Sequence, residues 1–208
     1  MARAKVILVD SDVISHFIAA GHIYDLDKIL SPHHLLIVEQ VYKEATYHPW
    51  DDSRKGEVDS WLAKSKAEKI SFPRQRMIVE EYYSLKHFNK RYGDGECACM
   101  AMAKYGKESI ASSNFRDVAE YCDANGIEYI GVLDILQIAL NKGIWDVEKC
   151  NKFIHDVVII NQARFPVDEI GNYKSKMRVC HKSMAHPLLC YLLHNPRSIV
   201  AYSKKGII

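Results

Sequence analysis

The sequence has few of the features that mark membrane, secreted or fibrous proteins. Its first ten residues, MARAKVILVD, contain only a four-residue apolar run before an acid, which is too short for a signal peptide or a membrane-spanning helix. Glycine and proline are sparse, at 10 and 6 of 208 residues, and the chain contains no low-complexity tract or internal repeat. We therefore expect an ordered, soluble, cytoplasmic protein that does not contact a membrane.

The cysteines and histidines lack the spacings of metal and redox sites. None of the six cysteines belongs to a CxxC pair, and Cys97 and Cys99 would point in different directions on a helix. The histidines of the first quarter show neither HxH nor HExxH spacing. The sequence therefore predicts free thiols in a reducing compartment, without a zinc site or a disulfide framework.

The charge is small overall but uneven along the chain. The net charge is +2, yet residues 146–208 contain ten basic and five acidic residues, which leaves eighteen basic and twenty-one acidic residues in 1–145. With 48% hydrophobic residues the chain can bury one full core. We expect an acidic main domain at 1–145 and a basic helical extension at 146–208, which is compatible with a polyanion contact.

Short apolar, β-branched runs alternate with helical patterns along the first 140 residues. The runs typical of buried strands lie at 5–9, 34–38, 109–112 and 127–131. The patterns typical of helices lie at 13–21, 24–30, 40–47 and 53–67, then from Pro73 up to Gly93, and at 97–106 and 115–125. Such alternation favours right-handed crossovers and a mainly parallel sheet with helices on both faces. The sequence thus predicts a three-layer α/β/α fold.

Helical spacing also predicts which side chains face inward. Ser11 or Asp12 is expected to cap the first helix, and a further amphipathic helix is expected at 147–160. The apolar residues expected on buried helix faces are Val58, Trp61, Leu62, Met77, Ile78, Tyr82, Leu85, Phe88, Val147, Cys150, Ile154 and Val157.

Four acidic residues stand at or near strand ends. Asp10 follows VILV, and Glu44 lies in the VEQVYKEA segment after the second strand. Glu96 opens a helix in GDGECACMAMA, and Asp117 lies in SSNFRDV after a later strand. The carboxyl ends of parallel strands meet at one edge of a sheet, where sites form. In this order the four motifs resemble those of the PIN-domain (VapC-like) nucleases, over about residues 4–140.

The resemblance implies a metal-dependent endoribonuclease that leaves a 5′-phosphate and a 3′-hydroxyl. It implies that Asp10, Glu96 and Asp117 bind Mg²⁺ or Mn²⁺, with Glu44 as a further ligand or as the group that orients the attacking water. General chemistry agrees, because hard cations held by carboxylates activate water and relieve charge on a leaving oxygen. Converging carboxylates without a cation would repel one another and raise at least one pKa.

Other residues are candidates for contacts around the metal and the RNA. The amide of Asn114 can position water or substrate without adding charge, and the hydroxyls of Ser112 and Ser113 could bond a ligand carboxylate. The basic residues of the tract at 173–182, which we interpret as a phosphate contact or as a solvated surface, are Lys174, Lys176, Arg178 and Lys182. The stretch at 82–92 interleaves aromatic rings with cations, which is typical of a nucleic-acid surface or of a packed helix with a basic outer side.

The roles of two further acids, and two alternative functions, are left undecided by the sequence. Asp12 is either a helix cap or a fifth site acid, and Asp94 either complements the helix dipole or binds metal. VILVDSDV also resembles the first motif of haloacid dehalogenase-like phosphatases, with Asp10 as nucleophile, but the acids of GDGE precede IASSN, the reverse of that family's order. A PIN module that binds RNA or protein without cutting is the other alternative.

Partners are the least constrained part of the prediction. RNA is the expected substrate, and the sequence leaves open a cognate antitoxin protein and a homodimer. The chain departs from compact PIN toxins in the long segment between Glu44 and Glu96 and in the extension after about residue 145.

Overall fold

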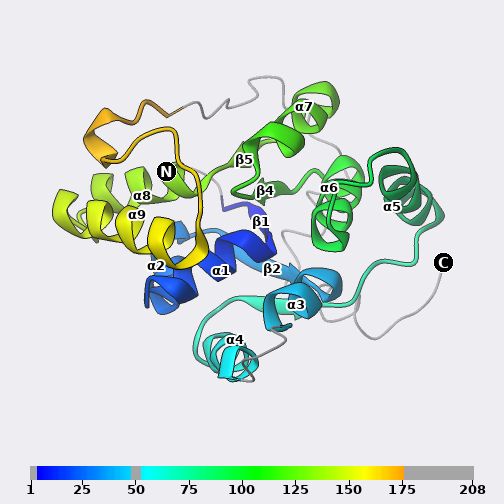
Figure 1. Ribbon diagram of the computed structural model, residues 1–208. Coiled ribbons are helices and arrows are strands. Elements are labelled where there is room, and N and C mark those ends of the chain that lie inside the picture. Colours follow the sequence, from blue (N-terminus) through cyan, green and yellow to red (C-terminus); the bar gives the residue numbers. More distant parts are fainter. Residues whose placement is uncertain (1–3, 48–52, 176–208) are drawn as a thin grey trace.

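A parallel sheet lies at the centre of the molecule (Figure 1). The computed structural model describes residues 4–47 and 53–175, and of residues 115–117 it describes the backbone alone. Its strands are β1 (Val6–Val9), β2 (His34–Val38), β3 (Glu68–Ile70), β4 (Ser109–Ala111) and β5 (Tyr129–Ile130). Their order in the sheet is β3-β2-β1-β4-β5, and all four pairings are parallel.

The order of the strands creates a switch point. The chain adds β2 and β3 on one side of β1 and then crosses to add β4 and β5 on the other side. In open parallel sheets, sites form outside the carboxyl ends of the strands where the direction of strand addition reverses. Here that position is the gap between the ends of β1 and β4, where Val9 is paired with Ala111.

Helices cover both faces of the sheet, as a three-layer α/β/α fold requires. They are α1 (Ser11–Ala19), α2 (Leu26–Leu30), α3 (Glu39–Thr46), α4 (Ser53–Lys64), α5 (Arg76–Phe88), α6 (Asp94–Gly106), α7 (Phe115–Asn125), α8 (Val132–Asn141) and α9 (Val147–Asn161), with short 3-10 turns at η1 (Ile23–Asp25) and η2 (Ile170–Asn172). On one side α6 packs on the strands with α5 outside it, and on the other side lie α8 and α9 (Figure 1). None of the described helices is long and apolar enough to cross a membrane.

The described part of the extension shares the main core. Phe153 of α9 packs on Phe17 of α1 with ring centroids 4.8 Å apart, and Trp145 lies 5.6 Å from the same Phe153 ring. Cys150, Phe153, Ile154 and Val157 are all buried in the cluster that contains the strands. Each fully buried side chain of this size stabilises the fold by roughly 1.5–3 kcal/mol. The first helix after residue 145 is therefore held firmly against α1.

The elements agree with the sequence prediction in most places and differ in several. The helix expected at 53–67 ends at Lys64, and the helical pattern expected up to Gly93 ends at Phe88. Residues 68–70 form the edge strand β3, which was not predicted. The strand expected at 127–131 has only two residues, Tyr129–Ile130. The helix α8, with the sequence VLDILQIALN, was not assigned from the sequence.

Three of the residues expected to face inward are exposed. Ile78, Tyr82 and Leu85 are buried as predicted, but Met77 is 54% and Phe88 is 84% exposed. Val147 is 48% exposed at the start of α9, whereas Cys150, Ile154 and Val157 are buried. Each of the three wrong predictions lies in the first or last turn of its helix, where the ends extend beyond the surface that buries the middle.

Candidate active site

Asp10 occupies the switch point. It follows β1 directly, and its backbone N–H donates to the carbonyl of Ala111 at 2.9 Å, so the ends of β1 and β4 are joined at this residue. The Oδ1 atom accepts from the Ser11 N–H at 2.7 Å, and Oδ2 accepts from the Ser112 hydroxyl at 2.9 Å. The residue is 1% exposed. Asp10 itself is the N-cap of α1, so the prediction that Ser11 or Asp12 caps this helix is wrong.

The surroundings of Asp10 disfavour its charge. Burial, followed by the nearby negative charges of Asp12 and Glu96, raises the pKa of Asp10 from 3.8 to about 8. The two hydrogen bonds from Ser11 and Ser112 lower this pKa but do not compensate for the loss of water. The pKa of Asp10 is thus set mainly by burial and by the two neighbouring acids.

Glu96 reaches the same place from α6. Its Oε2 atom accepts from the N–H of Gly93 at 3.1 Å, which caps the helix, and its Oε1 atom accepts from the Asn114 amide at 2.9 Å. The Asn114 backbone N–H in turn donates to the Ser112 hydroxyl at 3.2 Å. Glu96 is 8% exposed. The turn from Ser112 to Asn114 therefore holds both buried acids, one through a hydroxyl and the other through an amide.

Glu44 lies beside these two acids and accepts hydrogen bonds from the first residue of α1 and from the first turn of α6. Its Oε1 atom accepts from the N–H of Gly95 at 3.0 Å, and its Oε2 atom accepts from the Ser11 hydroxyl at 3.1 Å. A Cβ atom on Gly95 would lie 2.5 Å from the Glu44 Oε2 atom and 3.0 Å from a methyl group of Val41. Glycine at position 95 is therefore required by the close approach of α3 to α6.

The remaining predicted acids have other partners. Asp12 is exposed and accepts from the Ser113 hydroxyl at 3.2 Å, so Ser113 contacts this acid instead of Asp10. Asp94 forms an ion pair with Lys86 at 2.5 Å in the first turn of α6. Asp12 still contributes to the site electrostatically, because its charge raises the pKa of Asp10.

The other predicted residues lie at the limits of the described structure. The backbone of Asp117 is in the first turn of α7, but its side chain lies outside the description. Lys174 is exposed, and the neighbouring Tyr173 donates its hydroxyl to the buried Asp134 at 2.9 Å. Three residues of the basic tract, Lys176, Arg178 and Lys182, fall outside the described residues.

The described side chains do not complete a metal site by themselves. Among the side chains that the structure describes, which exclude those of residues 115–117, no group of three His, Cys, Asp or Glu is arranged to hold a metal ion. Burial, followed by the charges of Asp10, Glu44 and Glu96, raises the pKa of the nearby Cys99 thiol well above its usual value. The acids that meet at this edge offer carboxylate oxygen atoms as donors.

Sequence reasoning missed the two donors that fix Glu44. The hydroxyl of Ser11 and the N–H of Gly95 lie next to predicted acids, but neither residue was singled out for this role. A signal was present in the GDGE segment, where two glycines flank an acid at a helix start. Glycine at such a place allows close backbone approach to another group, which here is the Glu44 carboxylate.

Comparisons with known proteins show little similarity. No protein-family model matches the chain. No curated protein matches it either. A crystal structure of VapBC2 from Rickettsia felis bound to a DNA fragment from their promoter is similar, with a TM-score of 0.47 and 13% sequence identity. The similarity covers 61% of this chain and 98% of the other.

Proposed function

We propose that this protein is a metal-dependent endoribonuclease of the PIN-domain type. The observation that carries the proposal is the pair Asp10 and Glu96, two buried acids at the switch point of a parallel sheet. Both are fixed by one turn, since Ser112 bonds Asp10 and Asn114 bonds Glu96. Buried like charges destabilise a fold, so their fixed positions favour a role in binding a cation.

The donors at this site are carboxylate oxygens, which suit Mg²⁺ or Mn²⁺. Both ions prefer carboxylate and water oxygens, and the side chains of Asp10 and Glu96 supply carboxylates. Asp10 and Glu96 would hold the ion together with Asp117, which the PIN resemblance places at the same edge. A bound ion would supply charge neutralisation at the scissile phosphate and a water molecule of lowered pKa.

The chain's own residues would fix the geometry around that ion. Ser112 and Asn114 each occupy one oxygen of an acid, which leaves the remaining lone pairs in defined directions. Glu44 is a positioning residue in this proposal, because its carboxylate joins α3 to the first residue of α1 and to the start of α6. Moving Glu44 would shift Asp10 and Glu96 relative to each other.

Cleavage of an end-labelled single-stranded RNA tests the proposal. The wild-type protein should cut internally with Mg²⁺ or Mn²⁺ and not in chelator, and the products should carry 5′-phosphate ends. Glu96→Gln should reduce the rate by about 100-fold or more, because metal-assisted stabilisation is worth several kcal/mol. Asp168→Asn, which changes an exposed acid before η2, is the matched control and should cut normally.

Three outcomes would contradict the proposal. RNA that is bound but stays intact with every divalent ion would identify a binding module that does not cut. Hydrolysis of p-nitrophenyl phosphate with RNA left intact would favour a phosphatase. Cleavage that continues in chelator and in Glu96→Gln would show that these acids do not hold a catalytic ion.

A further inference from the structure

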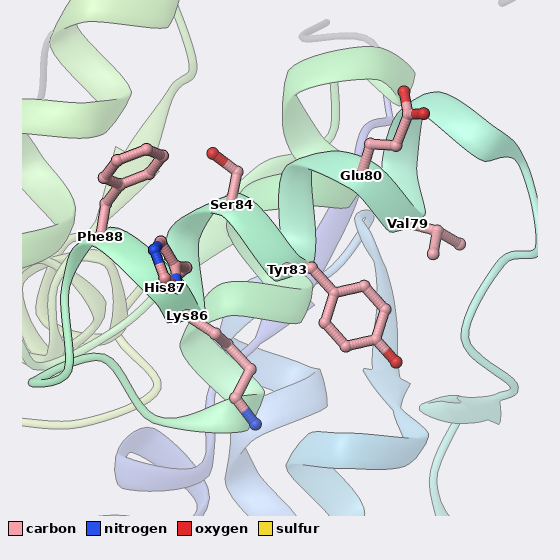
Figure 2. A pocket seen from close by; sticks show the side chains of 7 residues that line it. All are labelled: Val79, Glu80, Tyr83, Ser84, Lys86, His87 and Phe88. Carbon is pink, nitrogen blue, oxygen red and sulfur yellow. The ribbon is translucent and has the colours of Figure 1, made fainter.

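The outer face of α5 carries aromatic side chains that the fold does not bury. Tyr83 is 64% and Phe88 is 84% exposed, while Tyr82 and Leu85 on the inner face are buried. Figure 2 shows Phe88 on one side of this face and Tyr83 on the other, with Ser84, Lys86 and His87 near them. These side chains, all on α5, line a shallow and open part of its surface. Single exposed apolar residues are common on proteins, but a cluster of them indicates an interaction surface.

Each exposed ring is supported by a neighbouring ring. Tyr83 packs edge-to-face against the buried Tyr82 with centroids 5.2 Å apart, and Phe88 packs in the same way against His87 at 5.4 Å. These contacts leave both rings largely exposed. Two aromatic rings are therefore presented to the solvent.

The charge of this surface is positive at its end nearest α6. Its carboxylates are neutralised, since Glu80 pairs with Arg76 at 2.6 Å and Asp94 pairs with Lys86 at 2.5 Å. Lys90 and Arg91 are exposed and form no ion pair with a carboxylate in the described part of the chain. Two cations thus follow the aromatic face directly in the sequence and in the structure.

The same end leads into the candidate active site. The loop that contains Lys90 and Arg91 joins α5 to α6, and Glu96 lies in the first turn of α6. α5 packs along α6 throughout this region. An extended polyanion on the outer face of α5 would therefore pass the loop cations and arrive beside the buried acids.

We propose that this surface, defined as Tyr83, Phe88, Lys90 and Arg91, binds single-stranded RNA. Unpaired bases stack on exposed aromatic rings, and phosphates are attracted to adjacent cations, so this pairing of side chains fits a single strand. The surplus of positive charge favours a polyanion over an apolar protein segment as the occupant. The proposal rests on the nuclease function proposed above and names the path by which its substrate reaches the acids.

Binding of a short, fluorescein-labelled oligouridylate in chelator tests this surface without requiring cleavage. Tyr83→Ala and Phe88→Ala should each raise the Kd about tenfold, near the lower part of the range for one stacked base. Tyr83→Phe and Phe88→Trp should retain binding, because stacking needs a ring and not a particular substituent. Ile160→Ala, which removes an apolar side chain that is 59% exposed on α9, is the matched control and should bind normally.

The part of the proposal that concerns Lys90 and Arg91 can be tested separately. Lys90→Ala combined with Arg91→Ala should lower the slope of log K against log salt by about 1.4, at roughly 0.7 per single-strand contact. Lys66→Ala, an exposed lysine after α4, should leave the slope unchanged. An unchanged slope in the double variant would show that these cations contact no phosphate and would overturn their part of the proposal.

Measuring both RNA binding and RNA cleavage shows which of the two proposals is wrong, the RNA-binding surface or the nuclease function. Normal binding together with a changed sedimentation coefficient in the Tyr83→Ala, Phe88→Ala double variant would assign the surface to protein association and overturn the inference. Binding that depends on these rings, with RNA left uncut in every metal, would support the surface while refuting the nuclease. Cutting at the wild-type rate by a double variant with unchanged Kd would support the nuclease and refute the surface.

Discussion

Replacing Asp10 with Asn should abolish cleavage and, without metal, stabilise the protein increasingly as the pH rises. The folded-state pKa of Asp10 is about 8, raised mainly by burial. An unfolded chain would have an aspartate pKa of about 3.9. Between these two values the folded carboxyl keeps its proton while the unfolded one has lost it. Folding is then opposed as pH rises, because the native state binds the extra proton.

The expected change in unfolding free energy follows from one proton, which the folded carboxyl group keeps and the unfolded one loses. The contribution of Asp10 to the free energy of unfolding should fall by about 1.4 kcal/mol for each pH unit between about pH 4 and pH 8, and level off above that range. Asparagine keeps the shape of the side chain, and the Ser112 hydroxyl can reorient to accept from the new amide. The difference between variant and wild type should therefore grow with pH until about pH 8.

Urea denaturation in chelator at pH 5, 6, 7 and 8 measures this difference. Asp168→Asn serves as the control, because its carboxyl group is exposed. Parallel stability curves for wild type and Asp10→Asn would refute the reasoning, because they would mean that the carboxyl is already ionised at pH 5. Addition of Mg²⁺ should stabilise the wild type and not the variant if Asp10 holds the ion.

Three more changes test the surroundings of the site. Glu44→Gln should lower kcat for RNA cleavage by about tenfold or more with little change in unfolding free energy, and an altered melting temperature alone would mean that Glu44 is only structural. Gly95→Ala should destabilise the fold by about 1–3 kcal/mol, since its Cβ would lie 2.5 Å from Glu44, whereas Gly56→Ala on α4, with nothing within 4 Å, should stabilise it by up to about 1 kcal/mol. Tyr173→Phe should remove a hydrogen bond to buried Asp134 and speed proteolysis after this point, with cleavage of a very short RNA unchanged.

The positions of Asp10 and Glu96 could be predicted because they depend on local rules. An acid that ends a buried apolar strand has to emerge at the carboxyl edge of a parallel sheet, and an acid at the third position of a helix lies beside its N-terminus. The strand at 34–38 was confirmed without change for the same reason, since its short apolar run HLLIV is typical of a buried parallel strand.

Features that depend on distant approaches could not be predicted in this way. The edge strand β3 has three residues and none is fully buried, so its local sequence carries no strand signal stronger than that of a helix end. The contact between Glu44 and Gly95 spans 51 residues and depends on how α3 crosses α6. Helical spacing likewise could not show that Phe88 projects past the core, and this exposed ring became part of the proposed RNA surface.

Cations lie on both sides of the buried acids along the carboxyl edge of the sheet. Lys90 and Arg91 lie in the loop before α6, at the same edge as Asp10. Beyond β5 the edge continues into the first turn of α8, where the buried Asp134 accepts from the hydroxyls of Tyr173 and Ser175. Lys174, the first cation of the basic tract, is exposed between these two anchors. A strand of RNA laid along this edge would therefore meet positive charge before and after the acids, and its repulsion by the acids would be offset on both sides.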